Sequence, residues 1–217
     1  MTCVHLGLIP DGNRRWSKQN KGVTFDYPGM VVNIVKNFLS GEKEFEVPIK
    51  VNEFSMYLLS KDNLQREDNS VEVVENTVDS LDKLMFTTLG PMLEENNISI
   101  KFNIYGETHL LSEKFQKRLE SFKKRHSNEN GTFVINLAIA YDPVLDSERL
   151  LKDGIESRRP IDLVIRTGFE KRSSGFFPLQ TLYSEWFYYD IFFPDITIDT
   201  VKDSLYGFVQ RKRNFGK

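Results

Sequence analysis

Residues 8–16, LIPDGNRRW, place one acid and two bases on a short polar turn that directly follows an apolar run. Backbone N–H groups where a helix begins bind anions, and Gly12 lets a ligand approach the backbone closely. Arg15 adds a charge-assisted donor suited to phosphate oxygens. Asp11 would repel a bare phosphate, so its presence indicates a Mg²⁺ ion between carboxylate and phosphate. Local chemistry also allows a plainer interpretation, an N-capping Asp11 followed by a solvated basic turn.

Two further segments place phosphate-compatible side chains after β-rich runs. Segment 162–178, DLVIRTGFEKRSSGFFP, has Arg166 at the end of its apolar run, followed by two more bases and two hydroxyls (Lys171, Arg172, Ser173, Ser174). Segment 58–66, LLSKDNLQR, offers Ser60, Asp62, Asn63 and Arg66. For Asn63 a turn-forming role is the plainer alternative. The arginines, hydroxyls and glycine-containing turn of segment 162–178 offer a second anion site. Three strand ends with such groups favour an anion-binding edge of the sheet over scattered surface charge.

The elements that must position these residues alternate between two types. Short β-rich runs predict strands at 4–9, 49–58, 98–106, 132–141, 162–167 and, more weakly, 189–193. Helical spacing predicts helices at 29–41, 71–96, 109–126, 143–153, 179–187 and 197–213, with a further helix beginning near Arg14. Such alternation predicts a single α/β domain over residues 1–217, with a mainly parallel six-stranded sheet flanked by helices. Ligands of such sheets bind beyond the carboxyl ends of the strands.

Composition narrows the class of protein. Lys and Arg number 29 against 31 Asp and Glu in 217 residues, a formal charge of -2, so no basic field points to nucleic acid. Cys3 is the single cysteine, which excludes an internal disulfide framework and any paired-cysteine metal site. No apolar run approaches the roughly 18 residues that span a bilayer. The N-terminus lacks the features of a signal peptide, so we expect a cytoplasmic protein.

At this point the sequence resembles the cis-prenyltransferases, undecaprenyl diphosphate synthase and its relatives. Their first motif, H-x-x-x-I-M-D-G-N-x-R-W, is similar to HLGLIPDGNRRW at residues 5–16. Their later motif, D-L-x-I-R-T-x-G-E-x-R-x-S-x-F, is similar to DLVIRTGFEKRSSGFF from residue 162, and Y-x-E and W-P-D resemble YSE and FPD further on. Segment 58–66 resembles their F-S-x-E-N-W-x-R. The resemblance covers nearly the whole chain, in the right order.

The resemblance implies a role for each matching residue. An allylic diphosphate would lie on Gly12, Asn13, Arg14 and Arg15, assisted by Arg66, although Arg14 is also explained as a solvated base. Arg166, Arg172 and Ser174 would bind the diphosphate of the second substrate. Asp11 would be the magnesium-linked acid that helps the first diphosphate leave, Glu185 the second magnesium-linked carboxylate, and Asn63 the residue implicated in proton removal. The family also implies Mg²⁺ as cofactor and a homodimer.

Departures from the family pattern bear on the exact reaction. Thr24 and Pro28 stand where the family has an Arg and a His, so part of the usual grip on the allylic diphosphate is absent. Lys171 replaces a histidine, Leu64 replaces a tryptophan, and the C-terminal R-x-G is altered to Arg213 followed by NFG. The compact length and the run RSSGFFPL resemble the cyclolavandulyl and lavandulyl diphosphate synthase branch, which couples two dimethylallyl diphosphates head-to-middle.

The sequence therefore predicts a Mg²⁺-dependent prenyltransferase that couples dimethylallyl or geranyl diphosphate with a second C5 diphosphate to a short, branched product. Large residues of helix 71–96, among them Leu81, Met85 and Phe86, would fill the product tunnel, although plain core packing also explains them. The aromatic run 185–195 would line a carbocation, or belong to the core or a subunit interface. A regular cis-prenyl synthase using isopentenyl diphosphate, a terpene cyclase on the same fold and a non-catalytic partner subunit are the alternatives.

Overall fold

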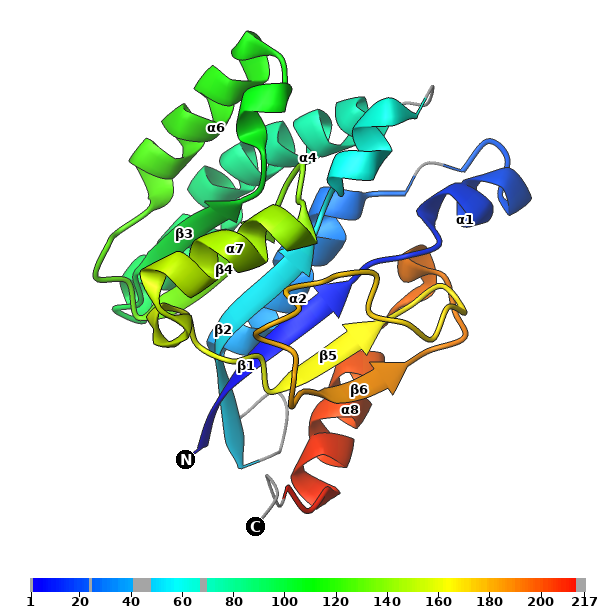
Figure 1. The fold of residues 1–217 in the computed structure, drawn as a ribbon, viewed down its shortest axis with the longest axis vertical. Helices are drawn as coiled ribbons and strands as arrows, with labels where there is room; N and C mark the ends of the chain where they lie inside the picture. The colour runs from blue at the N-terminus through cyan, green and yellow to red at the C-terminus, as the bar shows by residue number, and fades with distance from the viewer. Residues whose placement is uncertain (1, 24, 41–47, 67–69, 214–217) are drawn as a thin grey trace.

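A six-stranded sheet forms the centre of the molecule (Figure 1). The computed structural model describes residues 2–23, 25–40, 48–66 and 70–213. Its strands are β1 (Thr2–Ile9), β2 (Ile49–Tyr57), β3 (Ile100–Tyr105), β4 (Phe133–Ala138), β5 (Leu163–Arg166) and β6 (Glu185–Tyr188). They lie in the order β3-β4-β2-β1-β5-β6, and every neighbouring pair is parallel. The predicted α/β fold with a parallel six-stranded sheet is confirmed.

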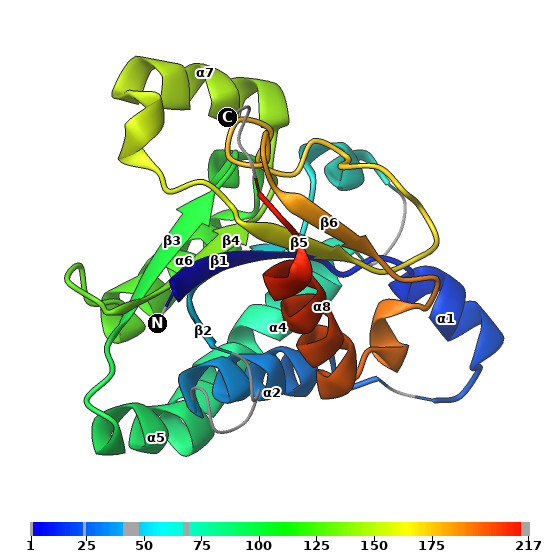
Figure 2. The ribbon, with the colours of Figure 1, turned by 90° about the horizontal axis from the view of Figure 1, so that it is seen from below.

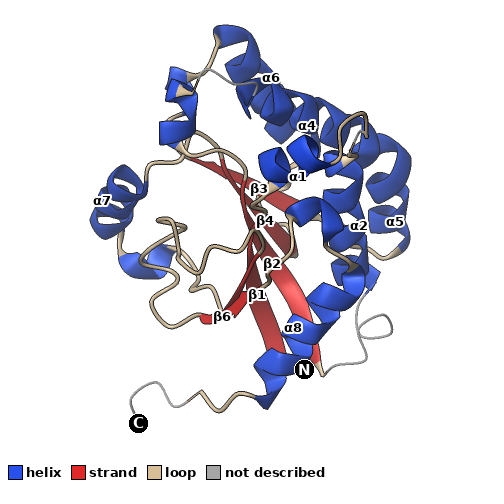
Figure 3. Cartoon of the chain, turned by 90° about the vertical axis from the view of Figure 1, so that its right-hand side faces the viewer, coloured by secondary structure: helices blue, strands red, loops and turns tan. Residues whose placement is uncertain are grey.

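Helices cover the two faces of the sheet unequally (Figures 2 and 3). The helices are α1 (Asn13–Gln19), α2 (Tyr27–Ser40), α4 (Ser70–Leu84), α5 (Gly90–Glu95), α6 (Glu113–His126), α7 (Pro143–Asp153) and α8 (Ile198–Gln210). One face carries α2, α4, α5, α6 and α8, and the other carries α7 and the segment that joins β5 to β6. Shielding is most complete at β5, LVIR, whose four residues are all buried, whereas the inner strand β2, IKVNEFSMY, includes polar residues such as Glu53 and Ser55.

The long predicted helix at 71–96 is divided into three pieces. It begins as α4, widens into a π-helical turn at Met85–Leu89 and resumes as α5 at Gly90. Pro91 has no N–H to donate to the preceding turn, which explains a local change of hydrogen bonding there. Gly90 is required, because a Cβ atom at this residue would lie 2.5 Å from the Met85 carbonyl oxygen.

Two sequence predictions near the C-terminus are wrong. No helix forms over 179–187, and the sixth strand is Glu185–Tyr188 instead of 189–193. The apolar run 189–193 instead bonds to the turns at the carboxyl edge: the Ile191 carbonyl accepts from Gly168 N–H (2.7 Å), and Phe193 N–H donates to the Asp11 carbonyl (3.0 Å). Its backbone is therefore committed to these turns and not to a strand ladder.

An apolar cavity of about 20 Å³ lies between the sheet and the helices of its more covered face. Only hydrocarbon and thioether side chains line it: Val31, Val32, Val35, Phe54, Leu81, Met85, Leu89, Phe102, Phe122, Ile135 and Leu137. Leu81 and Met85 line this space, which agrees with plain core packing, and their role in a product tunnel stays a prediction. Phe86 does not line it, because its side chain points outward and is 62% exposed. A cavity of this size has room for about one water molecule.

Candidate active site

The turn after β1 and the end of β5 meet at the carboxyl edge of the sheet. Ile9 is the register partner of Arg166, so the residues that follow the two strands become neighbours. Arg166 donates from Nη2 to Asp11 Oδ2 at 2.8 Å. The arginine is 2% exposed, whereas 36% of the Asp11 side chain is exposed. A buried cation therefore holds a half-exposed carboxylate at this edge. The parallel topology predicted the shared edge but not this ion pair.

Hydrogen bonds fix the backbone of the Asp11–Gly12 turn. Asp11 Oδ1 accepts from Gly12 N–H at 2.7 Å, and the Asp11 carbonyl accepts from the Thr167 hydroxyl at 2.9 Å. Gly12 has φ +99°, in the left-handed region, and a Cβ atom there would lie 2.5 Å from the Phe192 ring. Asn13 begins α1 and donates its side-chain amide to the Pro10 carbonyl at 2.8 Å. Only glycine fits at position 12, which explains why the turn between β1 and α1 contains a glycine at this point.

Arg15 points from α1 toward the loop that follows β5. Its Nη2 donates to the Gly168 carbonyl (2.6 Å) and to Glu170 Oε2 (2.7 Å), and lies 3.7 Å from Asp11 Oδ1. The hydrogen bond to Glu170 raises the pKa of Arg15, and Arg15 in turn lowers the pKa of Glu170. Sequence reasoning assigned Glu170 no role. The sequence did contain a signal for such a role, because Glu170 is an acid between Arg166 and Arg172 in a segment rich in bases, where an ion pair is expected.

The predicted second-substrate residues also lie together. Arg166 Nη1 donates to Ser174 Oγ at 2.8 Å and to the Arg172 carbonyl oxygen. Ser174 has φ +49° and Gly175 φ +72°, so the chain reverses directly beside Arg166. The side chains of Arg172 and Ser174 are exposed at the rim of this turn. The structure thus forms a second cationic group, which contacts Asp11 Oδ2, whereas Arg15 lies nearest to Oδ1.

The segment after β2 reaches the same edge. Residues Lys61–Gln65 form a 3₁₀ turn, in which Ser60 Oγ accepts from Asn63 N–H at 3.3 Å. Arg66 ends the turn and is exposed. Tyr57, which sequence reasoning missed, ends β2 and directs its hydroxyl to the Ser174 carbonyl at 3.5 Å. Burial, with a smaller effect of nearby carboxylates, raises the pKa of Tyr57 to about 12.

Glu185 lies away from this edge. It begins β6 and is the register partner of Leu163, whereas Arg166 at the other end of β5 contacts Asp11. Three residues of strand separate these positions by roughly 10 Å. Arg211 binds Glu185 at 2.7 Å. Asp11 and Glu185 therefore cannot hold the same ion within one protomer, and a metal role for Glu185 stays a prediction.

The structure describes some, but not all, of the positions at which this sequence departs from the family motifs. Pro28 is the second residue of α2, where the first helical turn has no N–H partner to lose. Arg213 donates to Asp162 Oδ1 at 3.0 Å, at the start of β5 and remote from Asp11. Thr24 and the altered C-terminal residues 214–216 lie outside the described residues. The predicted loss of phosphate contacts at Thr24 thus stays a prediction.

The groups around Asp11 fit a magnesium ion that is shared with a substrate. Within the described ranges, no three or more His, Cys, Asp and Glu side chains gather as a metal cage. Mg²⁺ is commonly held by one or two carboxylates together with substrate phosphates and water. Asp11 is half exposed and lies between two arginine-containing groups, so its carboxylate suits that mode of binding.

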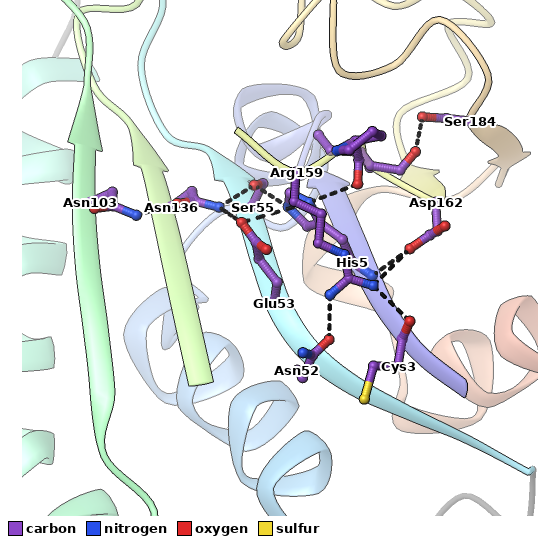
Figure 4. Close-up of polar contacts among 12 residues, drawn as sticks. Cys3, His5, Asn52, Glu53, Ser55, Asn103, Asn136, Arg159, Asp162 and Ser184 are labelled. Atoms are coloured by element: carbon purple, nitrogen blue, oxygen red, sulfur yellow. Dashed lines mark hydrogen bonds and ion pairs between the residues drawn. The ribbon is translucent and has the colours of Figure 1, made fainter. Parts of the chain in front are cut away.

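A second polar cluster lies on the α7 face of the sheet, around the middle of β1, β2 and β4 (Figure 4). The Pro160 carbonyl can only accept, so His5 donates from Nδ1 (3.1 Å) and its Nε2 accepts from the Ser55 hydroxyl (2.7 Å). Asn136 donates to Ser55 Oγ and to Glu53 Oε1. The cations beside this cluster form ion pairs: Lys101–Glu129, Arg158–Asp146 and Arg159–Asp162. Because these cations are already paired with carboxylates, the cluster suits a structural role better than diphosphate binding.

Because His5 is buried and neutral, we expect the stability of the fold to fall in mild acid. Burial, with Arg159 nearby, lowers the pKa of His5 from 6.5 to about 3, so the fold holds the ring neutral. A lowered folded-state pKa contributes stability above about pH 6.5 that is lost as the pH falls toward 3. Between pH 6.5 and 5 we expect His5 to account for a loss of about 2 kcal/mol in the free energy of unfolding.

Urea unfolding of wild type and His5→Gln at several pH values between 7.5 and 5 measures this loss. The variant should be less stable at pH 7.5 and show a flatter pH dependence. His109→Gln is the matched control, because 69% of the His109 side chain is exposed, and it should parallel the wild type. Parallel curves for wild type and His5→Gln would show that His5 does not carry the pH dependence.

The fold and the site define a class of protein: a parallel α/β domain that places two cationic groups on either side of a carboxylate. A family model described as putative undecaprenyl diphosphate synthase matches residues 9–146 and 142–216. The chain therefore belongs to this family of prenyltransferases, as its motifs indicated.

Individual relatives agree with this assignment. A geranylgeranyl-diphosphate-specific tritrans,polycis-undecaprenyl-diphosphate synthase of Pyrobaculum aerophilum is 29% identical, covering 99% of this chain and 96% of the relative. Two solved structures share the fold at 22% identity, each covering 98% of both chains. They are lavandulyl diphosphate synthase from Lavandula x intermedia in complex with dimethylallyl diphosphate (TM-score 0.68) and a probable undecaprenyl diphosphate synthase from Campylobacter jejuni (TM-score 0.69).

Proposed function

We propose that this prenyltransferase couples an allylic diphosphate with a second C5 diphosphate at the Asp11 edge of the sheet. The observation that carries the proposal is the position of Asp11, which contacts Arg166 on one side (2.8 Å) and approaches Arg15 on the other (3.7 Å). Two anions bound by these arginines would lie on either side of one carboxylate. This arrangement suits a reaction in which one diphosphate leaves and the other stays.

The allylic diphosphate would be bound by Arg15 and the backbone of the Gly12–Arg15 turn, with Arg66 at the rim. Arg166, Arg172 and Ser174 would hold the diphosphate of the second substrate, keeping its double bond near the allylic carbon. Asp11 would hold Mg²⁺ against the leaving diphosphate, and the bound metal would neutralise the charge that develops there. Asn63 lies on the turn after β2 and is our candidate for assisting proton removal.

We further propose that the product is short and branched. The lavandulyl diphosphate synthase with a similar fold was solved with dimethylallyl diphosphate, a C5 substrate of the kind proposed here. The competing proposal is a regular cis-prenyl synthase, which the names of the curated relatives favour. A terpene cyclase is less well supported, because the second cationic group around Arg166 is intact.

A homodimer through the α7 face completes the proposal. Val144 and Leu151 are seven residues apart on α7, on one side of the helix, and are 63% and 64% exposed. Ile155, just beyond α7, is 46% exposed. An apolar stripe of this kind favours burial against another protein surface.

Among the described residues, no helix is long and apolar enough to cross a bilayer. The expected cytoplasmic location stays a prediction.

Product analysis distinguishes the two proposed reactions. With Mg²⁺ and dimethylallyl diphosphate alone, we expect a branched C10 diphosphate, identified after dephosphorylation by gas chromatography and mass spectrometry. A linear cis-prenyl diphosphate formed only when isopentenyl diphosphate is added would replace the branched proposal with the regular one. Chelation of Mg²⁺ should abolish either reaction, and turnover that persists in excess EDTA would contradict the metal role of Asp11.

A further inference from the structure

Phe169 has a backbone conformation and an exposure that fold stability does not explain. Its φ is +76°, in the left-handed region that bulky side chains disfavour, and 49% of the residue is exposed. Glycine would adopt such a φ at little cost. A large aromatic residue here loses backbone freedom and leaves apolar surface in water. Such a residue points to a constraint other than stability.

The loop around Phe169 is held in place on both sides. Gly168 N–H donates to the Ile191 carbonyl at 2.7 Å, and the Gly168 carbonyl accepts from Arg15 Nη2 at 2.6 Å. Gly168 packs so closely against Asp11 that a Cβ atom at position 168 would lie 2.8 Å from the Asp11 Cβ. The backbone that leads into Phe169 is therefore held against the Asp11 turn and Arg15.

The ring of Phe169 lies against the guanidinium of Arg15. Phe169 and Phe192 pack edge to face, with ring centroids 5.1 Å apart and planes at 70°. The Arg15 Cζ atom is 6.0 Å from the Phe169 centroid and 5.5 Å from that of Phe192. Both distances fall within the range of cation–π attraction. Arg15 is thus bordered by two rings while Glu170 and the Gly168 carbonyl accept from its Nη2.

We propose that Phe169 is a positioning residue that, with Phe192, holds the Arg15 guanidinium in the orientation that binds the allylic diphosphate. The inference rests on the proposed function, because it assigns Arg15 to that diphosphate. The two rings restrict the long Arg15 side chain before substrate arrives, so less conformational entropy is lost on binding. The left-handed backbone at Phe169 is the strain that this arrangement requires.

Four variants separate the ring from the backbone. Phe169→Ala removes the ring and keeps the strain, Phe169→Gly removes both, Phe169→Tyr keeps the ring, and Arg15→Ala removes the group that is positioned. Binding of inorganic pyrophosphate with Mg²⁺ by isothermal titration calorimetry needs no turnover. We expect Ala and Gly at position 169 to weaken binding about twofold to fivefold, Tyr to restore it, and Arg15→Ala to weaken it at least about tenfold.

Stability should follow a different order. Phe169→Gly should melt about 2–4 °C above Phe169→Ala, because only glycine relieves the left-handed strain. If Phe169 were merely structural, Phe169→Gly would bind pyrophosphate better than Phe169→Ala, and the inference would fail. In an Arg15→Ala background, Phe169→Ala should have no further effect, and an additive loss would also overturn the inference.

The outcomes also separate this inference from the proposed function. The expected pyrophosphate binding pattern without any prenyl transfer would support the positioning role and contradict the proposed reaction. If prenyl transfer is observed but the Phe169 variants bind pyrophosphate like wild type, the proposed reaction would be supported and the positioning role contradicted. Absence of measurable pyrophosphate binding by the wild type would overturn the positioning role.

Discussion

Asp11→Asn is expected to lower turnover by at least about 100-fold while the fold stays intact, because a transition-state metal contact is lost. The asparagine carbonyl can still accept from Gly12 N–H, whose hydrogen bond to Asp11 is 2.7 Å. Its neutral amide cannot neutralise Arg166 or hold Mg²⁺ with the same strength. The effect should therefore appear mainly in kcat, with circular dichroism unchanged and a modest fall in melting temperature.

A charge-matched control distinguishes this effect from a general loss of negative charge. Asp203→Asn changes an exposed acid on α8 and should leave turnover unchanged. Near-normal turnover in Asp11→Asn would remove Asp11 from the mechanism, and with it the placement of both substrates around this carboxylate.

Replacing the arginines of the second cationic group should chiefly weaken the second substrate. Arg172 is exposed, so Arg172→Gln should raise the KM for that substrate roughly tenfold, the effect of one charge-assisted contact, without lowering the melting temperature. Arg166→Lys is more severe. A lysine cannot reach Asp11, Ser174 and the Arg172 carbonyl at once, as the guanidinium does. We expect a loss of at least about 100-fold in kcat/KM, together with a destabilised fold.

Steady-state kinetics with geranyl diphosphate as the allylic substrate and dimethylallyl diphosphate as the second substrate, each varied in turn, measures this assignment. Lys124→Gln, an exposed cation on α6, is the control for net charge and should behave like wild type. If Arg172→Gln raised the KM for the allylic diphosphate and left the KM for the second substrate unchanged, the assignment of the two substrates to the two sites would have to be reversed.

Much of this site was predictable because parallel strands bring their carboxyl ends to one edge. β1 and β5 are largely buried runs, and β2 and β3 alternate apolar with polar residues, so these patterns mark them as strands. The positions of Asp11 and Arg166 at one edge follow from the parallel topology. β6 was displaced in the prediction because two neighbouring segments, 185–188 and 189–193, are both aromatic and apolar. Only the pairing with β5 distinguishes them.

The interactions of Arg15 were not predictable from spacing. They depend on left-handed backbone at Gly168 and Phe169, which turns Glu170 back toward α1. The family motif marked these positions but not their contacts. The position of Glu185 was not predictable either. It depends on the register between β5 and β6, which the neighbouring residues in the sequence do not reveal.

The most direct test of the central claim is the molar ratio of released pyrophosphate to prenyl diphosphate product. Coupling of two diphosphates at the Asp11 edge predicts one pyrophosphate for each C10 diphosphate formed, with Mg²⁺ and dimethylallyl diphosphate as the starting materials. Pyrophosphate release accompanied by a hydrocarbon or an alcohol, with no prenyl diphosphate product, would contradict the transferase and indicate a cyclase.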